Sequence, residues 1–215
     1  MCGCRAWPHF PVTQHTCTEE RMARSGERKT QILQTLAQML EGPSAERITT
    51  AALAARIGVS EAALYRHFRG KAEMFAGLID FVEQTLFTLI NRITSEEQSG
   101  LRQAEAIMTM LLGFAQKNRG MTRVLIGDAL VTEDDSLQAR INQIHDRLEA
   151  ALKQALRFAM TRKEVAEDID PGAQANALMS FVAGRWHQYA KSGFRRDPVE
   201  HWQRQWKQLM EGILA

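Results

Sequence analysis

The sequence predicts an all-α protein, with a small N-terminal three-helix domain followed by a larger helical bundle. Its 215 residues include only five prolines and are rich in Ala, Leu, Gln, Glu and Arg, which favour helices. Apolar residues recur at helical spacing in one segment after another, and no segment alternates as a strand does. Gly42, Gly58 and Gly70 interrupt the first third, so short helices are expected there and longer ones afterwards.

The individual helices follow from where this spacing starts and stops. Helices are expected over 27–41, 50–57, 61–68, 71–93, 101–118, 121–130, 136–160, 171–191 and 198–214. Gly42-Pro43-Ser44 ends the first of them, and Gly70 separates the third from the long fourth. The acidic stretch 164–170 is expected to be a mobile linker.

We expect three parts along the chain. These are a disordered extension over 1–23, a helix-turn-helix domain over 24–70 and a bundle over 71–215. The stretch beginning at Met22 reads like a natural start, so residues 1–21 are expected to be unstructured or to come from an upstream start codon. They lack the apolar region of a secretion signal, and no apolar run approaches the roughly 18 residues that a membrane span needs.

The chemistry-bearing residues argue against an enzyme. Cys2, Cys4 and Cys17 leave the rest of the chain without thiols, which excludes a disulfide scaffold and favours a reducing compartment. Their spacing with nearby histidines matches no zinc pattern, so no metal is expected. No glycine-rich phosphate loop or nucleophile elbow appears, so we expect no cofactor and no catalysis. His145 and His187 stand alone on long helices, as packing or surface residues do.

Charge is distributed unevenly between the two domains. Residues 24–71 contain eight basic and four acidic residues, so they carry +4, whereas the whole chain carries only +2. A positive first third on a slightly acidic remainder is typical of a nucleic-acid-binding protein, although such a split also arises by chance.

The run from Arg47 to Phe68 has the pattern of a helix-turn-helix. Thr49 and Ser60 are placed to cap two short helices, because their hydroxyls can accept bonds from free backbone N–H groups. Gly58 follows the first helix, where a left-handed backbone is easiest for glycine. Glu61, in the first turn of the second helix, suits the positive end of its dipole.

Apolar spacing predicts how these two helices pack. Leu53 and Ile57, four residues apart, are expected to face Leu64 and Phe68, which are also four apart. Val59 is expected to fill the corner, and the small side chains of Ala54 and Ala62 to lie where the helices approach. The result is a compact corner of two helices joined by a short turn.

The outward face of the second helix then becomes the candidate DNA-binding surface. The residues expected to contact DNA are Arg47, Thr49, Thr50, Ser60, Glu61, Ala63, Tyr65, Arg66, His67 and Lys71. Three of these have a competing interpretation. Arg66 could face the bundle, Tyr65 could be half-buried, and Lys71 could be a solvated lysine rather than a phosphate contact at a helix N-terminus. The motif as a whole could also be a helical hairpin with a cationic surface.

The same residues carry a family resemblance. The run from Ile48 to Phe68, followed by Lys71 and Phe75, resembles the DNA-binding domain of TetR-type regulators. A narrower resemblance, to the nucleoid occlusion factors within that family, covers about 27–214 and rests on stretches such as 117–125 and 137–143. It implies a cytoplasmic, nucleoid-associated homodimer that binds palindromic sites on double-stranded DNA. When bound to DNA, it would block assembly of the division protein FtsZ.

The resemblance also implies a partner site between the fourth and fifth helices, which would hold the C-terminal tail of FtsZ. Carried onto this chain, the site involves Phe81, Leu112, Gly113, Lys117 and Asn118. Leu89 stands where the family often has a basic residue. The residues themselves also allow an explanation without a partner. Gly113 could serve ordinary helix packing, and 117–118 could be a plain helix end. Phe81 lies off the apolar stripe and is expected to be exposed.

Two alternatives remain at the level of function. A ligand-responsive TetR-type repressor would enclose an effector in its bundle instead of binding a protein partner. The aromatic residues of the last helices fit either a dimer interface or such a cavity. They are Phe181, Trp186, Tyr189, Trp202 and Trp206.

Overall fold

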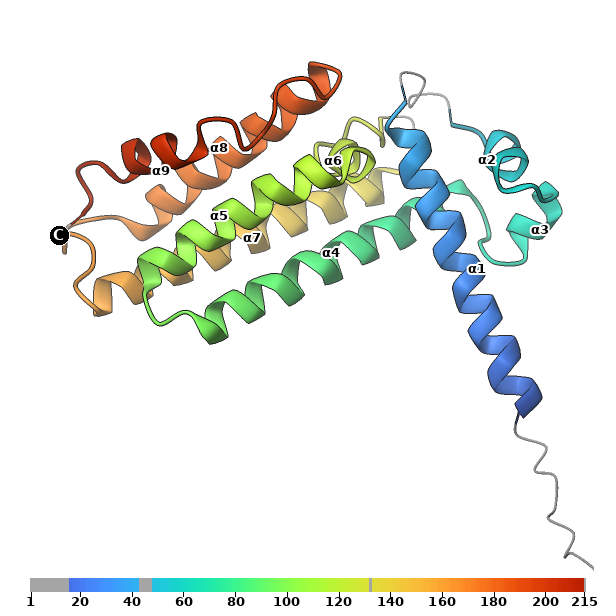
Figure 1. Ribbon diagram of the computed structural model, residues 1–215, viewed down its shortest axis with the longest axis horizontal. Coiled ribbons are helices and arrows are strands. Elements are labelled where there is room, and N and C mark those ends of the chain that lie inside the picture. Colours follow the sequence, from blue (N-terminus) through green and yellow to red (C-terminus); the bar gives the residue numbers. More distant parts are fainter. Residues whose placement is uncertain (1–15, 43–47, 132, 215) are drawn as a thin grey trace, which may run out of the picture.

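The computed structural model describes residues 16–42, 48–131 and 133–214, with side chains from residue 26 onward (Figure 1). Its helices are α1 (Thr16–Leu40), α2 (Thr50–Ile57), α3 (Glu61–Tyr65), α4 (Lys71–Glu96), α5 (Gly100–Lys117), α6 (Arg119–Leu125), α7 (Asp135–Thr161), α8 (Pro171–Lys191) and α9 (Trp202–Met210). The predicted all-helical class is confirmed. The start of α1 differs from the expectation, because residues 16–23 are helical rather than disordered; residues 1–15 lie outside the described part.

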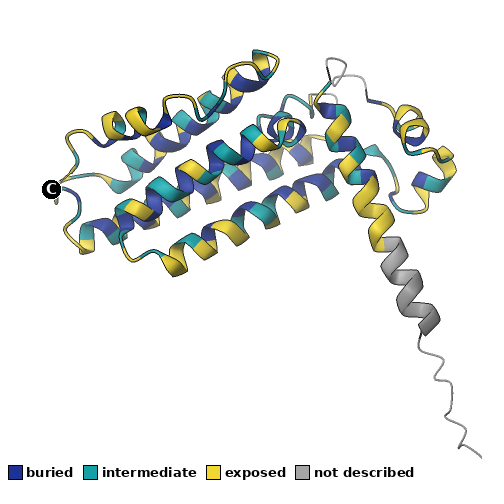
Figure 2. Cartoon of the chain, in the orientation of Figure 1, coloured by how far each residue is buried: buried dark blue, intermediate teal, exposed yellow. Residues whose placement is uncertain are grey.

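The helices form a small group joined to a longer bundle. Helices α1, α2 and α3 cluster at one end, and α4 runs from that cluster along the bundle (Figure 1). Helix α5 packs against α4, α7 and α8, and α6 packs against α1. Buried residues on the facing sides of the helices form one core that reaches from Ile32 in α1 to Trp206 in α9 (Figure 2). The small domain and the bundle therefore share a hydrophobic core.

The aromatic residues of the last two helices pack inside the protomer. Trp186 is fully buried, and its indole N–H donates to the carbonyl of Leu111 at 3.1 Å. Trp202 is also buried and donates to the hydroxyl of Thr109 at 2.7 Å. Tyr189 and Trp206 are buried as well, whereas Phe181 is only partly buried. The expectation of an exposed aromatic surface for a dimer interface is therefore wrong for the four buried rings. They complete the bundle's own core.

Both ends of the acidic stretch 164–170 make hydrogen bonds with other parts of the chain. Glu164 accepts hydrogen bonds from the Ser99 hydroxyl and the Leu101 N–H, both at 2.9 Å. Burial alone would raise the pKa of Glu164, but these bonds and the nearby Arg162 lower it. At the other end Asp170 caps α8, accepting the Gly172 N–H at 2.7 Å. Local composition suggested a mobile linker, whereas residues distant in the sequence bind its first residue and a helix cap binds its last one.

His145 predicts a pH dependence of stability. Its ring lies 5.8 Å from that of Trp186, edge to face, and its Nε2 is buried without a hydrogen-bond partner among the described residues. Burial lowers the pKa of His145, and the charge of His187 adds to this. A hydrogen bond with the Leu125 backbone and the charge of Asp146 act in the opposite direction.

Because the folded-state pKa is lowered, the unfolded chain binds the proton more readily. Stability should therefore be highest above the unfolded pKa of about 6.5 and fall as the pH drops below it. Melting temperatures measured across this range should show the loss in the wild type and a smaller loss in His145→Gln. His201→Gln, at an exposed position, is the matched control. Parallel curves for the wild type and His145→Gln would contradict the assignment.

Candidate nucleic-acid interface and partner groove

The turn between α2 and α3 forms as its residues predict. The Thr49 hydroxyl accepts the Ala52 N–H at 3.1 Å, and the Ser60 hydroxyl accepts the Ala63 N–H at 3.3 Å. Gly58 ends α2 in the left-handed region, with φ of 76°. Both helix N-termini therefore have the predicted caps, and the glycine takes a backbone conformation that other residues rarely adopt.

The corner behind α3 is apolar, with one difference from the expectation. Leu53, Leu64 and Phe68 are buried, and Ile57 and Val59 pack against them. Ala54 is buried where the two helices meet, but Ala62 is exposed. By helical geometry Ala62 and Arg66, four residues apart, lie opposite the buried Leu64. Ala62 therefore belongs to the outer face, where the sequence reasoning did not place it.

The outer face of α3 is open to solvent. Tyr65 is 49% exposed, and Glu61 and Arg66 are also exposed. The Thr50 hydroxyl donates to the Glu61 carboxylate at 2.6 Å and accepts from the Tyr65 hydroxyl at 3.4 Å. This network fixes polar groups of α2 and α3 along one flank of the face. Arg66 thus does not face the bundle, and Tyr65 presents its ring and hydroxyl.

The other predicted DNA contacts vary in accessibility. Thr49, Thr50 and Ser60 lie at the starts of the two helices, and Ala63 and His67 are partly exposed; Arg47 lies outside the described residues. Lys71 is neither free nor simply solvated. Its Nζ lies 2.5 Å from a carboxylate oxygen of Glu133 and 5.7 Å from the centre of the Phe75 ring. A phosphate contact by Lys71 therefore requires it to exchange partners.

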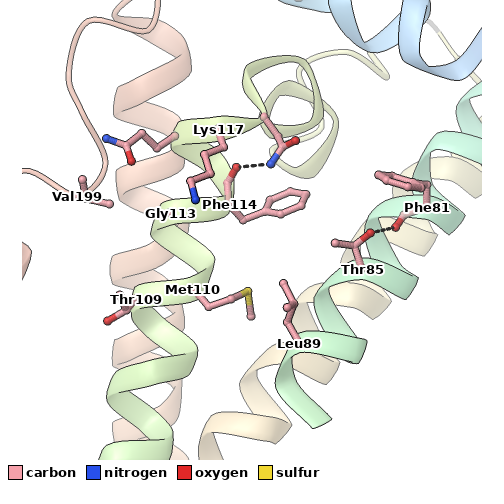
Figure 3. A pocket seen from close by; sticks show the side chains of 11 residues that line it. Phe81, Thr85, Leu89, Thr109, Met110, Gly113, Phe114, Lys117 and Val199 are labelled. Atoms are coloured by element: carbon pink, nitrogen blue, oxygen red, sulfur yellow. Dashed lines mark hydrogen bonds between the residues drawn. The ribbon is translucent and has the colours of Figure 1, made fainter. Parts of the chain in front are cut away.

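A groove of about 590 Å³ lies between α4 and α5 (Figure 3). It is lined by Phe81, Thr85, Leu89, Thr109, Met110, Gly113, Phe114, Gln116, Lys117, Asn118 and Val199. Five of its lining side chains are apolar and five are polar, and Phe81 is 48% exposed, as predicted. A Cβ built on Gly113 meets no atom within 4 Å. No helix of the described chain packs on this glycine, so it opens the wall of the groove instead.

The groove contains four of the five predicted partner residues. Leu112 is the exception, because it is fully buried and points into the core. Lys117 is exposed at the end of α5 and extends along the groove (Figure 3). The Asn118 side-chain amide donates to the Phe114 carbonyl at 2.8 Å, so this residue also closes the end of α5. Met110, Phe114 and Val199 line the groove without any signal in the sequence that separates them from core residues.

Sequence comparisons agree with this architecture. Residues 32–78 match the model described as bacterial regulatory proteins of the tetR family, and residues 98–213 match a tetracyclin repressor-like C-terminal domain of the SlmA-like type. The nucleoid occlusion factor SlmA of Marinomonas sp. is 47% identical over 89% of this chain and 97% of its own. That of Idiomarina loihiensis is 50% identical over 87% of this chain and 96% of its own. The chain belongs to the SlmA family.

Solved structures share the fold of this SlmA-family chain at low sequence identity. The fatty acid degradation regulator FadR from Bacillus halodurans has a TM-score of 0.71 at 14% identity, covering 86% of this chain and 95% of its own. The ketosteroid transcriptional regulator KstR2 of Mycobacterium tuberculosis has a TM-score of 0.70 at 15% identity, with 87% and 95% covered. These likenesses establish the TetR-type arrangement of helices.

Two further observations concern what this SlmA-family chain contains. Within 16–42, 48–131 and 133–214, no helix is long and apolar enough to cross a membrane. In the same ranges, His, Cys, Asp and Glu form no group of three that could hold a metal ion, while Cys2 and Cys4 lie outside them. The two matched models describe regulatory proteins rather than enzymes.

Proposed function

We propose that this chain binds specific sites on double-stranded DNA as a homodimer and, when bound, inhibits FtsZ assembly over the nucleoid. The C-terminal tail of FtsZ would occupy the α4–α5 groove. The observation that carries the proposal is the open apolar groove around Gly113, in a chain that also exposes a helix-turn-helix. The two surfaces involve different residues, so one protomer can hold DNA and a protein segment together.

The α2–α3 corner supports the DNA-binding part. Its outer face is exposed to solvent and is not part of the hydrophobic core. Both of its helices are capped at their N-termini. Exposed Arg66 and the hydroxyls of Thr50 and Tyr65 are donors suited to phosphates and base edges. The Lys71–Glu133 pair would open when a phosphate replaces the carboxylate.

Helix α8 supports the homodimer. Its exposed side carries small, uncharged residues one turn apart, namely Ala173, Ala177, Ser180 and Gly184. Small side chains allow two helices to approach closely. An isologous pairing across this face would repeat the recognition helix on the two halves of a palindromic site.

The chemistry of the groove supports a short protein segment as its occupant. Its walls offer exposed Phe81 and Leu89 for apolar side chains, and Lys117 for a carboxylate. An extended tail with apolar residues and at least one acidic group would fit these features. The groove is open along its length, which suits a chain segment better than an enclosed effector.

Sedimentation of FtsZ polymers tests the proposal. Purified protein with a duplex selected from the source genome should sharply reduce the pelleted FtsZ, and protein without that duplex should have much less effect. Lys117→Ala should restore pelleting and still bind the duplex, because Lys117 makes no hydrogen bond or ion pair with a described residue. Tyr65→Ala should restore pelleting by weakening DNA binding.

Two results would oppose the proposal. Unchanged FtsZ pelleting by the DNA-bound wild type would remove the division function and favour a ligand-responsive repressor. Loss of DNA binding in Lys117→Ala would instead assign Lys117 a structural role. Arg157→Ala, an exposed change on α7, is the control for surface charge.

A further inference from the structure

A second concave surface lies beside the recognition helix, between α1 and α3. It has a volume of about 210 Å³ and is lined by Arg28 and Ile32 of α1 and by Ala63, Arg66 and His67 around α3, among others. Its basic members are two arginines and a histidine, and no acidic residue lines it. The rest of its lining is apolar and comes from Ile32, Val59, Ala63 and Leu64.

The two arginines are not neutralised within the described structure. No ion pair joins Arg28 or Arg66 to a described carboxylate, and the Arg28 guanidinium donates only to the Gln31 side chain at 2.6 Å. By contrast, Lys29, the next residue of α1, lies over the Phe68 ring at 5.6 Å. Helix α1 therefore uses one cation for packing and leaves its neighbour facing the cleft.

The position of the cleft fits the geometry of DNA. An α-helix about 10–12 Å wide fills a major groove about 12 Å wide, so the two phosphate backbones pass along its two flanks. The hydroxyl of Tyr65 in α3, paired with that of Thr50 in α2, occupies one flank of α3. Helical geometry places Ala63 and His67 on the opposite flank, where the cleft opens. One flank is thus lined by hydroxyls and the other by guanidinium groups.

We propose that the α1–α3 cleft binds a backbone phosphate of the DNA strand along this flank, with Arg28 of α1 as a direct contact. Arg28 lies outside the helix-turn-helix, and its contact reads no base. It adds affinity and holds the register of α3 in the groove. The inference rests on the proposed DNA binding and extends the DNA-contacting surface to α1.

The test is the salt dependence of DNA binding, measured by fluorescence anisotropy with a specific duplex and with a scrambled one. Arg28→Gln should lower the magnitude of the slope of log K against log salt by about 0.9 for each bound protomer, because one phosphate contact is lost. The ratio of specific to scrambled affinity should stay unchanged. Arg28→Lys should keep the slope, and Arg157→Gln, near the C-terminal end of α7, is the control for removing an arginine.

A direct contact is separated from an indirect effect by the DNA itself. A methylphosphonate linkage removes one backbone charge, and a scan along the duplex should find a position that weakens the wild type but not Arg28→Gln. An unchanged slope in Arg28→Gln, or no such position, overturns the inference while leaving the proposed function intact. If the wild type binds neither duplex, the proposed DNA binding itself fails.

Discussion

Replacing Gly113 by leucine should abolish inhibition of FtsZ assembly while leaving DNA binding within about twofold of the wild type. A Cβ at this position meets no atom within 4 Å, so the new side chain extends into the groove and not into the core. It would occupy the space between Phe81, Leu89 and Met110 that a bound tail requires. The loss follows from steric exclusion, because the site is filled by the protein itself.

The same change should stabilise the fold. Gly113 lies inside α5, and glycine within a helix costs up to about 1 kcal/mol relative to alanine or leucine. The expected combination is therefore a raised melting temperature, retained DNA binding and lost activity on FtsZ. FtsZ sedimentation, DNA titration and thermal melting measure the three properties. Ala150→Leu, which adds leucine at an exposed position of α7, should leave inhibition intact.

Retained inhibition by Gly113→Leu would show that the groove is not the partner site. The DNA-binding proposal would survive that result, because it depends on a different surface. A lowered melting temperature would indicate that the groove closes in solution over Gly113.

Local sequence patterns predicted the α2–α3 corner well because its geometry depends on neighbouring residues. Thr49 and Ser60 cap helices through bonds to residues three positions later, and Gly58 needs only its own freedom to adopt positive φ. The bounds of α2 and α8 agree with the expectation for the same reason, since a cap or a proline marks the start of each. Capping and turn chemistry act within a few residues, so sequence alone reveals them.

The partner groove was predicted less completely, and Leu112 shows why. Helix α5 is apolar on most of its circumference between Ile107 and Ala115, so periodicity cannot separate its core face from its groove face. The packing of other helices around α5 decides which of its residues are buried, so that Leu112 lies in the core while Met110 and Gly113 face the groove. That packing involves residues far apart in the chain.

Long-range contacts also explain the other differences. The sequence suggested that Trp186 belongs to an exposed aromatic surface, but in the bundle its side chain is packed against α5. The start of α1 was missed because residues 16–26 have no apolar stripe, although Glu, Arg, Met and Ala there favour a helix. Helices were recognised in the sequence mainly by the apolar stripe that they bury. A helical segment without such a stripe is therefore missed.

Replacing Gly120 by alanine should destabilise the chain by about 1–3 kcal/mol and weaken DNA binding, because an added methyl cannot fit between α6 and α1. A Cβ on Gly120 would lie 1.9 Å from the backbone oxygen of Ala37 and 3.1 Å from the Cβ of Leu40. These atoms belong to the body of α1 and cannot turn aside as a long side chain can. The two helices must separate, and α1 would shift relative to the bundle.

A shift of α1 would affect both the DNA-binding surface and the groove between α4 and α5. Helix α1 supports α2 and α3 and carries Arg28, while Gly120 lies two residues after Asn118 and three after Lys117 at the end of the groove. Gly120→Ala should therefore lower DNA affinity and FtsZ inhibition together, whereas Gly113→Leu should separate them. Urea unfolding and DNA titration measure the two effects. Gly113→Ala is the matched control, because the same methyl enters open space there and should raise stability instead. Equal stability of Gly120→Ala and the wild type would mean that α1 and α6 are not in close contact in solution. The DNA-binding domain and the groove would then have to be linked through α4 alone.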